Sequence, residues 1–167
     1  MDLSTLRNFC GIASLFLPQK PLRFGRPLSL GVRLKSSMSI FQGNSWSITL
    51  LPEWTGEHEE ECSTVYHPRG VGALKISSYS KDSVVTESDL REFAQERIEA
   101  GAKLHESITG DFKGFTLAFA AEDEFWQYWY VANSNKFLLI TYNCNEANLG
   151  PEREQAKSMV ASLKAAT

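Results

Sequence analysis

The run that decides the fold is residues 114–144, GFTLAFAAEDEFWQYWYVANSNKFLLITYNC. It predicts three successive strands, because β-branched and aromatic residues fill three runs and turn-forming clusters separate them. The two turns are Glu122-Asp123-Glu124 and Asn133-Ser134-Asn135. Many of the large apolar side chains lie in this antiparallel meander, so we expect the core to form around it.

The middle strand of the meander, residues 125–131, has two apolar faces. Alternation places Trp129 on one face and Trp126, Tyr128 and Tyr130 on the other. A half-solvated strand would carry polar side chains on one side. Either a helix covers each face, or one face presents aromatic rings to a partner. We expect Trp129 in the core and name Trp126, Tyr128 and Tyr130 as the candidate protein-binding residues.

The remaining segments predict further strands and two helices. Thr86 or Ser88 can cap the first helix, Gly101 ends it, and Pro151 suits the first position of the second, which runs to Leu163. The acidic run 57–61 predicts a solvated loop. The other strands are expected at residues 46–51, 62–67, 72–79 and 103–109, the last near a sheet edge.

The order is therefore β-β-β-α-β-β-β-β-α. It predicts an α+β fold with a single antiparallel sheet of about six or seven strands and two amphipathic helices packed on it.

Residues 46–164 resemble the PsbP/DcrB-like sandwich, a fold shared by several families of small bacterial proteins. The resemblance is carried by four segments: WSITLLPEW at 46–54, GALKIS at 72–77, LITY at 139–142, and the closing helix ending in Ser162-Leu163. It implies a binding or assembly module, because members of this fold include photosystem accessory proteins, envelope lipoproteins and adaptors of toxin secretion. No lipobox cysteine leads the chain, which counts against the lipoprotein branch.

Charge divides the sequence into two parts. Residues 1–37 carry six basic residues and one acid, whereas residues 38–167 carry eleven basic and nineteen acidic residues. We interpret 1–37 as a disordered tail, a targeting peptide, or sequence upstream of a true start at Met38, and 38–167 as one domain. The apolar run at residues 9–17 is too short to span a bilayer. The acidic domain argues against nucleic-acid binding, and we expect a cytoplasmic protein.

The sequence offers few groups for catalysis or metal binding. His58, Cys62 and His67 form the one metal-like cluster, but its spacing is unlike that of zinc sites, so we expect neither metal nor other cofactor. Cys144 lacks the local signature of a nucleophile, and Cys62 and Cys144 are expected to be buried thiols. Asp123 and Glu124 lie together in a turn, where carboxylates are ordinarily solvated.

These observations favour a non-enzymatic protein that binds another protein, and an immunity-type protein or a secretion adaptor would fit this role. One alternative is a small-ligand carrier with a pocket beside the aromatic strand. An enzyme is the third, and least supported, hypothesis.

Overall fold

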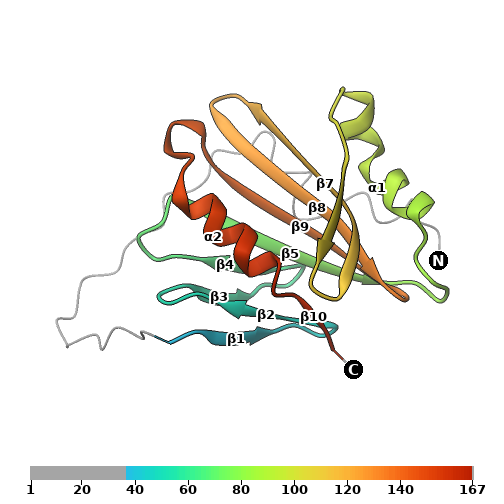
Figure 1. Ribbon diagram of the computed structural model, residues 1–167, viewed down its shortest axis with the longest axis horizontal. Helices are drawn as coiled ribbons and strands as arrows, with labels where there is room; N and C mark the ends of the chain where they lie inside the picture. Colours follow the sequence, from blue (N-terminus) through green and yellow to red (C-terminus); the bar gives the residue numbers. More distant parts are fainter. Residues whose placement is uncertain (1–36, 167) are drawn as a thin grey trace.

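The structure, a computed structural model, describes residues 37–166 (Figure 1). The interpretation of residues 1–37 as a tail thus lies, apart from Ser37, outside the described residues. The fold is α+β and antiparallel, as predicted, with a seven-stranded sheet ordered β3-β4-β5-β9-β8-β7-β6. Its strands are β3 (Thr55–His58), β4 (Ser63–Tyr66), β5 (Gly72–Ser80), β6 (His105–Thr109), β7 (Phe112–Ala121), β8 (Glu124–Asn133) and β9 (Lys136–Asn145).

A second sheet of three strands, β1 (Ser39–Gln42), β2 (Trp46–Leu50) and β10 (Lys164–Ala165), corrects the expectation of a single sheet. The first predicted strand, β2, lies in this small sheet and pairs with both of its neighbours. Its alternation was readable because Trp46, Ile48 and Leu50 are buried. The four residues of β1 and the two of β10 carry too little pattern to be predicted from sequence.

Two further boundaries differ from the expectation. Glu57 and His58, predicted in a solvated loop, end β3, an edge strand whose side chains are mostly exposed. The helix α2 (Pro151–Val160) ends before Leu163. The chain turns there because the Leu163 carbonyl accepts a hydrogen bond from Asp111 N at 3.0 Å and the Leu163 side chain is fully buried.

The meander is confirmed as β7, β8 and β9, joined by tight turns. Glu122 and Asp123 have φ of 52° and 65°, and Ser134 has φ of 53°. Positive φ at both central residues, as at Glu122 and Asp123, or at the first alone, as at Ser134, is typical of the two-residue turns whose twist matches paired strands. Acidic and Asn-rich clusters are thus found where the chain reverses.

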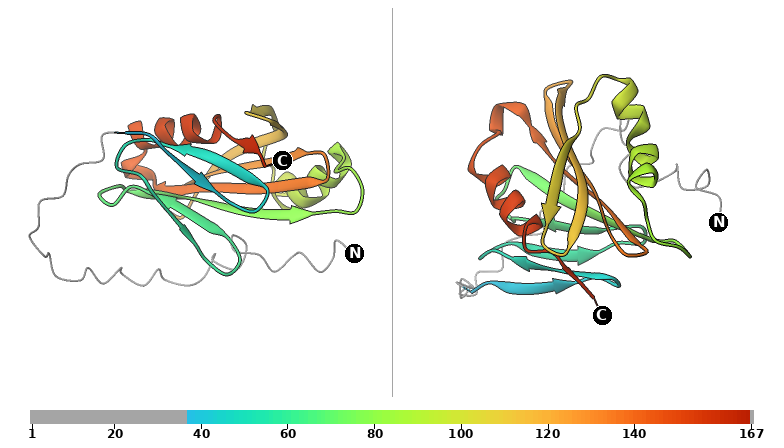
Figure 2. Two further views of the ribbon diagram at one scale, coloured as in Figure 1. Left: turned by 90° about the horizontal axis from the view of Figure 1, so that it is seen from below. Right: turned by 45° about the vertical axis from the view of Figure 1, so that its right-hand side comes forward.

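The two helices cover opposite faces of the large sheet, as their separate core clusters show. In Figure 1, α2 crosses in front of the sheet, and α1 (Glu87–Glu99) lies beside β7 and β8. Figure 2 shows the small sheet beside α2, which it joins in one core cluster. Thr86 caps α1 by accepting a hydrogen bond from Asp89 N while Asp89 accepts one from Thr86 N. Among the described residues, other elements therefore cover both faces of the central strands at least in part.

Candidate functional site

The aromatic face of β8 lies under α1. Tyr128 and Tyr130 are 2% and 3% exposed, and Trp126 is half-buried at the end of the cluster. The rings of Tyr128 and Tyr130 stack at 6.0 Å, and Leu90 and Ala94 of α1 pack in the same cluster. The expectation that this face is open to a partner is thus wrong for the two tyrosines, because the apolar stripe of α1 needs such a surface to cover.

Burial also sets the chemistry of these tyrosines. It raises the pKa of Tyr128 and of Tyr130 above the ordinary tyrosine value. On the opposite face, Trp129 is 4% exposed and lies in the cluster that α2 covers, so its predicted core position is confirmed.

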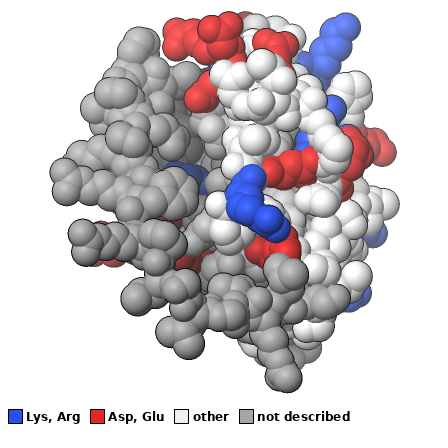
Figure 3. All heavy atoms as spheres, turned by 90° about the vertical axis from the view of Figure 1, so that its left-hand side faces the viewer, with Lys and Arg blue, Asp and Glu red and all other residues white. Residues whose placement is uncertain are grey.

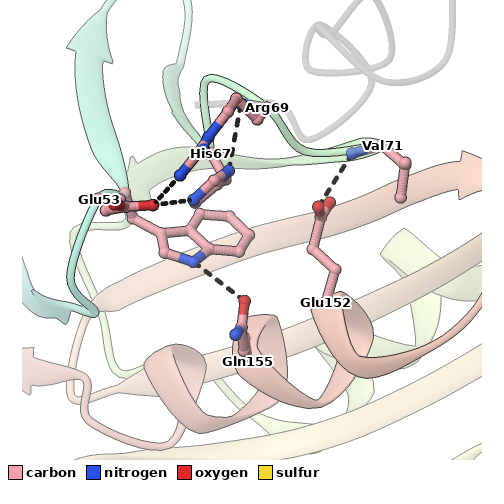
Figure 4. A network of polar contacts seen from close by, with 7 residues as sticks. Glu53, His67, Arg69, Val71, Glu152 and Gln155 are labelled. Carbon is pink, nitrogen blue, oxygen red and sulfur yellow. Dashed lines mark hydrogen bonds and ion pairs between the residues drawn. The ribbon is translucent and has the colours of Figure 1, made fainter.

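The metal-like cluster is separated into two local contacts. His58 stacks on Phe41, with centroids 4.6 Å apart, and its Nδ1 lies 2.9 Å from Ser63 Oγ. His67 instead lies 3.1 Å from Glu53, which also accepts a hydrogen bond from Arg69 at 2.7 Å (Figure 4). Hydrogen bonds from Arg69 and His67 lower the pKa of Glu53. Between residues 37 and 166, no three His, Cys, Asp or Glu side chains gather as a metal site.

Figure 4 also shows how α2 is held to the β4–β5 turn. The carboxylate of Glu152 accepts hydrogen bonds from Val71 N at 2.9 Å and Gly72 N at 2.7 Å. Gln155 accepts one from the indole nitrogen of Trp54 at 3.3 Å. These polar groups are used by the fold, so they are poor candidates for chemistry.

The two cysteines of the domain are buried, as predicted. Burial raises the pKa of the Cys144 thiol, which is the direction opposite to activation of a nucleophile.

The strand β7 has an open edge that the sequence analysis missed. Its neighbour β6 pairs only as far as His105↔Thr116, whereas β7 continues to Ala121. Within the described residues, no strand pairs with the outer edge of residues 117–121, LAFAA. Natural proteins usually protect such an edge with charged residues, proline or a bulge. This segment has neither charge nor proline, and its register with β8 is continuous.

The register decides which backbone groups this edge offers. Two-residue turns join Thr109 to Phe112 and Ala121 to Glu124, and the closing pair of such a turn exchanges both backbone hydrogen bonds. Alternation along β7 then directs the N–H and C=O of even-numbered residues toward β6 and of odd-numbered residues toward β8. Beyond the end of β6, Ala118 and Ala120 therefore present their backbone groups outward.

A hollow of about 690 Å³ lies along this edge. Its lining residues include Arg97 near the end of α1, Lys103 of the α1–β6 connection, His105 at the start of β6 and Arg153 of α2, and none of them is Asp or Glu. The described residues carry eleven basic and nineteen acidic side chains, so a lining with only basic charges is unusual here. Figure 3 shows Asp and Glu side chains, with some Lys and Arg, on the face seen from the left of Figure 1. Two other hollows do have acidic lining residues. One, of about 680 Å³, is lined in part by Glu87 and Glu106, and the other, of about 590 Å³, by the glutamates at 59–61.

The Lys and Arg side chains of this hollow form no ion pair with a carboxylate among the described residues. Five of the eleven described Lys and Arg side chains form ion pairs with carboxylates: Arg69, Lys81, Arg91, Lys157 and Lys164. Arg97, Lys103 and Arg153 form none among residues 37–166. Their charge is thus available to a ligand at the open edge of β7.

Solved structures support the predicted resemblance. The solution structure of cyanobacterial PsbP (CyanoP) from Synechocystis sp. PCC 6803 is similar with a TM-score of 0.56 at 11% identity, covering 83% of this chain and 98% of CyanoP. A crystal structure from Bacteroides thetaiotaomicron VPI-5482 gives a TM-score of 0.55 at 18% identity, covering 73% of this chain and 45% of the other. The chain thus spans less than half of the Bacteroides protein. No family model and no curated protein matches the sequence.

These likenesses show a PsbP-like fold and nothing beyond the fold. Within residues 37–166, no helix has the length and apolar character needed to cross a membrane.

Proposed function

We propose that the protein binds another protein by adding an extended segment of that partner to the open edge of β7. The observation that carries the proposal is the unprotected edge of residues 117–121, where Ala118 and Ala120 offer their backbone groups outward. A partner strand pairing there would gain main-chain hydrogen bonds, which is a common mode of peptide recognition. The proposal moves the binding site from the buried face of Tyr128 and Tyr130 to this edge.

The hollow beside the edge gives an incoming strand space. Ala118 and Ala120 are exposed and small, and residues 100–103 of the α1–β6 connection line the other side of the hollow. An immunity-type protein or a secretion adaptor would act through such a contact. The cytoplasmic location expected from the sequence and the bacterial origin implied by the resemblance stay predictions.

A small-ligand carrier is the second candidate, because 690 Å³ is a usual volume for a ligand pocket. The buried Gln127 also lines the hollow, where its amide donates to Thr116 Oγ1 at 3.3 Å and accepts from Arg153 at 3.1 Å. We favour the protein segment because a small ligand would leave the backbone groups of Ala118 and Ala120 unused.

The experiment is a selection of peptides from a random dodecapeptide display library on the full chain, with counter-selection on Ala118→Pro. Proline removes the outward N–H and leaves the pairing with β8 in place, so the variant should fold while losing peptides. Its thermal unfolding is the control, and Lys113→Pro, which removes an N–H directed at β8, is the damaging comparison. Peptides that bind the parent and not Ala118→Pro would support the proposal.

Failure to enrich any peptide, or equal binding to Ala118→Pro, would contradict strand addition. If the proline variant does not fold, hydrogen exchange of the parent decides the question. A bound peptide should slow exchange at the amides of Ala118 and Ala120 and leave those of Leu117 and Phe119 unchanged.

A further inference from the structure

The two arginines of the hollow lie on opposite faces of the sheet. Arg97 belongs to the α1 face, since its guanidinium carbon lies 5.0 Å from the ring centroid of Phe119 and 5.4 Å from that of Tyr128. Arg153 belongs to the α2 face, where its guanidinium carbon lies 4.6 Å from the ring centroid of Phe125. One arginine thus lies on each face of the sheet, beside the part of β7 that has no neighbouring strand.

Each arginine is oriented but keeps donors for a ligand. One terminal nitrogen of Arg97 donates to the Tyr128 hydroxyl at 3.4 Å, and Arg153 Nε donates to Gln127 Oε1 at 3.1 Å. Gln127 is itself 6% exposed and donates a hydrogen bond to Thr116, so a buried side chain of the sheet fixes the position of the Arg153 guanidinium. The other guanidinium N–H groups have no partner among the described residues. They can therefore grip a carboxylate with two hydrogen bonds.

A strand added to β7 would continue the sheet, and its side chains would alternate between the same two faces. Two consecutive residues of that strand would therefore face Arg97 and Arg153, one each. On the α2 side, the small side chains of Ala118 and Ala120 leave the path to Arg153 open. On the α1 side, Phe119 lies beneath Arg97 and beside the edge.

We propose that the segment recognised at the β7 edge carries two adjacent acidic residues, one bound by Arg97 and the other by Arg153. This inference rests on the proposed function and names its partner: an extended, acidic segment of another protein. Charge complementarity supports it, since Lys103 and His105 add to the basic lining and none of the lining residues is Asp or Glu. The net charge of the described residues is −8, so the local sign is opposite to that of the domain.

The test uses the peptides that survive the display selection with Ala118→Pro counter-selection. Their sequences should contain an Asp or Glu pair at adjacent positions, and replacing either acid by its amide should weaken binding about tenfold, since a hydrogen-bonded charge pair is worth that much. Arg97→Met should abolish the preference for acid at one position only, and Arg153→Met at the adjacent one. Methionine preserves the packing on the aromatic rings.

The matched control is Lys113→Met, which removes an exposed charge from the same strand outside this hollow and should leave affinity unchanged. Edge-dependent peptides without an acidic pair would overturn this inference and leave strand addition intact. If both arginine variants affect the same peptide position, the opposite-face arrangement is refuted. Sedimentation of the parent and of Ala118→Pro tests whether the edge joins two copies of the chain. If the parent is a dimer and the variant loses all binding only because that dimer dissociates, the edge belongs to a second copy and the inference is overturned.

Discussion

A guanidinium nitrogen of Arg97 lies 3.4 Å from the hydroxyl of Tyr128 and donates a hydrogen bond to it. The contact joins the last turn of α1 to the middle strand of the meander. It therefore closes the aromatic face at one end and places the charge of Arg97 at the border between the core and the open edge of β7.

The first prediction concerns this aromatic face. Replacing Tyr128 and Tyr130 together by serine should lower the free energy of unfolding by more than about 4 kcal/mol, because two buried rings are removed beneath α1. Urea denaturation measures the change. An unchanged denaturation midpoint would show that the two rings are exposed in solution. Both tyrosines would then again be candidate protein-binding residues.

Trp129 provides the matching prediction for the α2 face. Trp129→Ala should cost about 3–5 kcal/mol, as for other buried large aromatics. Trp126→Ala is the control, since Trp126 is half-buried and should cost clearly less. Equal losses in the two variants would mean that the assigned inner face of β8 is wrong.

The capping box of α1 predicts a dependence on pH. The ammonium of Lys81 at 2.8 Å and the N–H of Thr86 hold the pKa of Asp89 below its ordinary value. Its contribution to stability is therefore complete above the ordinary pKa near 3.8 and is lost as the pH falls through the lowered value. Asp89→Asn should cost about 1 kcal/mol at pH 7, as for loss of a cap. As the pH falls below that ordinary value, the gap between variant and parent should narrow. A constant gap would rule out the ionised carboxylate as its source.

The register of β7 predicts an alternating pattern of hydrogen exchange in the free protein. Amides of Leu117 and Phe119, bonded to β8, should exchange at least about tenfold more slowly than those of Ala118 and Ala120, which have no partner strand. NMR of the labelled chain measures each amide. The interior strand β8, paired on both sides, should show slow exchange at consecutive residues and serves as the control. Uniform protection along 117–121 would mean that something already covers the edge.

Metal content is the last prediction. Protein purified without a chelator or a metal-affinity tag should carry no stoichiometric zinc, because His58 and His67 are each engaged in separate contacts. Elemental analysis by mass spectrometry measures it. Zinc that is present and lost on Cys62→Ser would contradict the prediction.

The meander and helix starts were readable because their signals are local. The aromatic run of β8, the turn at Glu122-Asp123 and the cap at Thr86 are each signals formed by neighbouring residues. That both faces of β8 are covered could not be predicted, since both are apolar and the answer depends on where α1 docks. The open edge was missed for a similar reason. Its arginines lie on two helices far apart in sequence, and the edge itself shows only as the difference in length between β6 and β7.

The pairing of β5 with β9 also has a kinetic consequence. Ser80 and Lys136, which close one end of that pairing, are 56 positions apart, whereas β7, β8 and β9 are joined by two-residue turns. Closing a long loop costs entropy before the contact repays it, so hairpins form in microseconds and distant strands join later. A folding chain should therefore hold the meander first, with β5 and then the small sheet added to it. During that interval the β9 edge would be open as well, so a folding chain would expose a second edge at which aggregation can start.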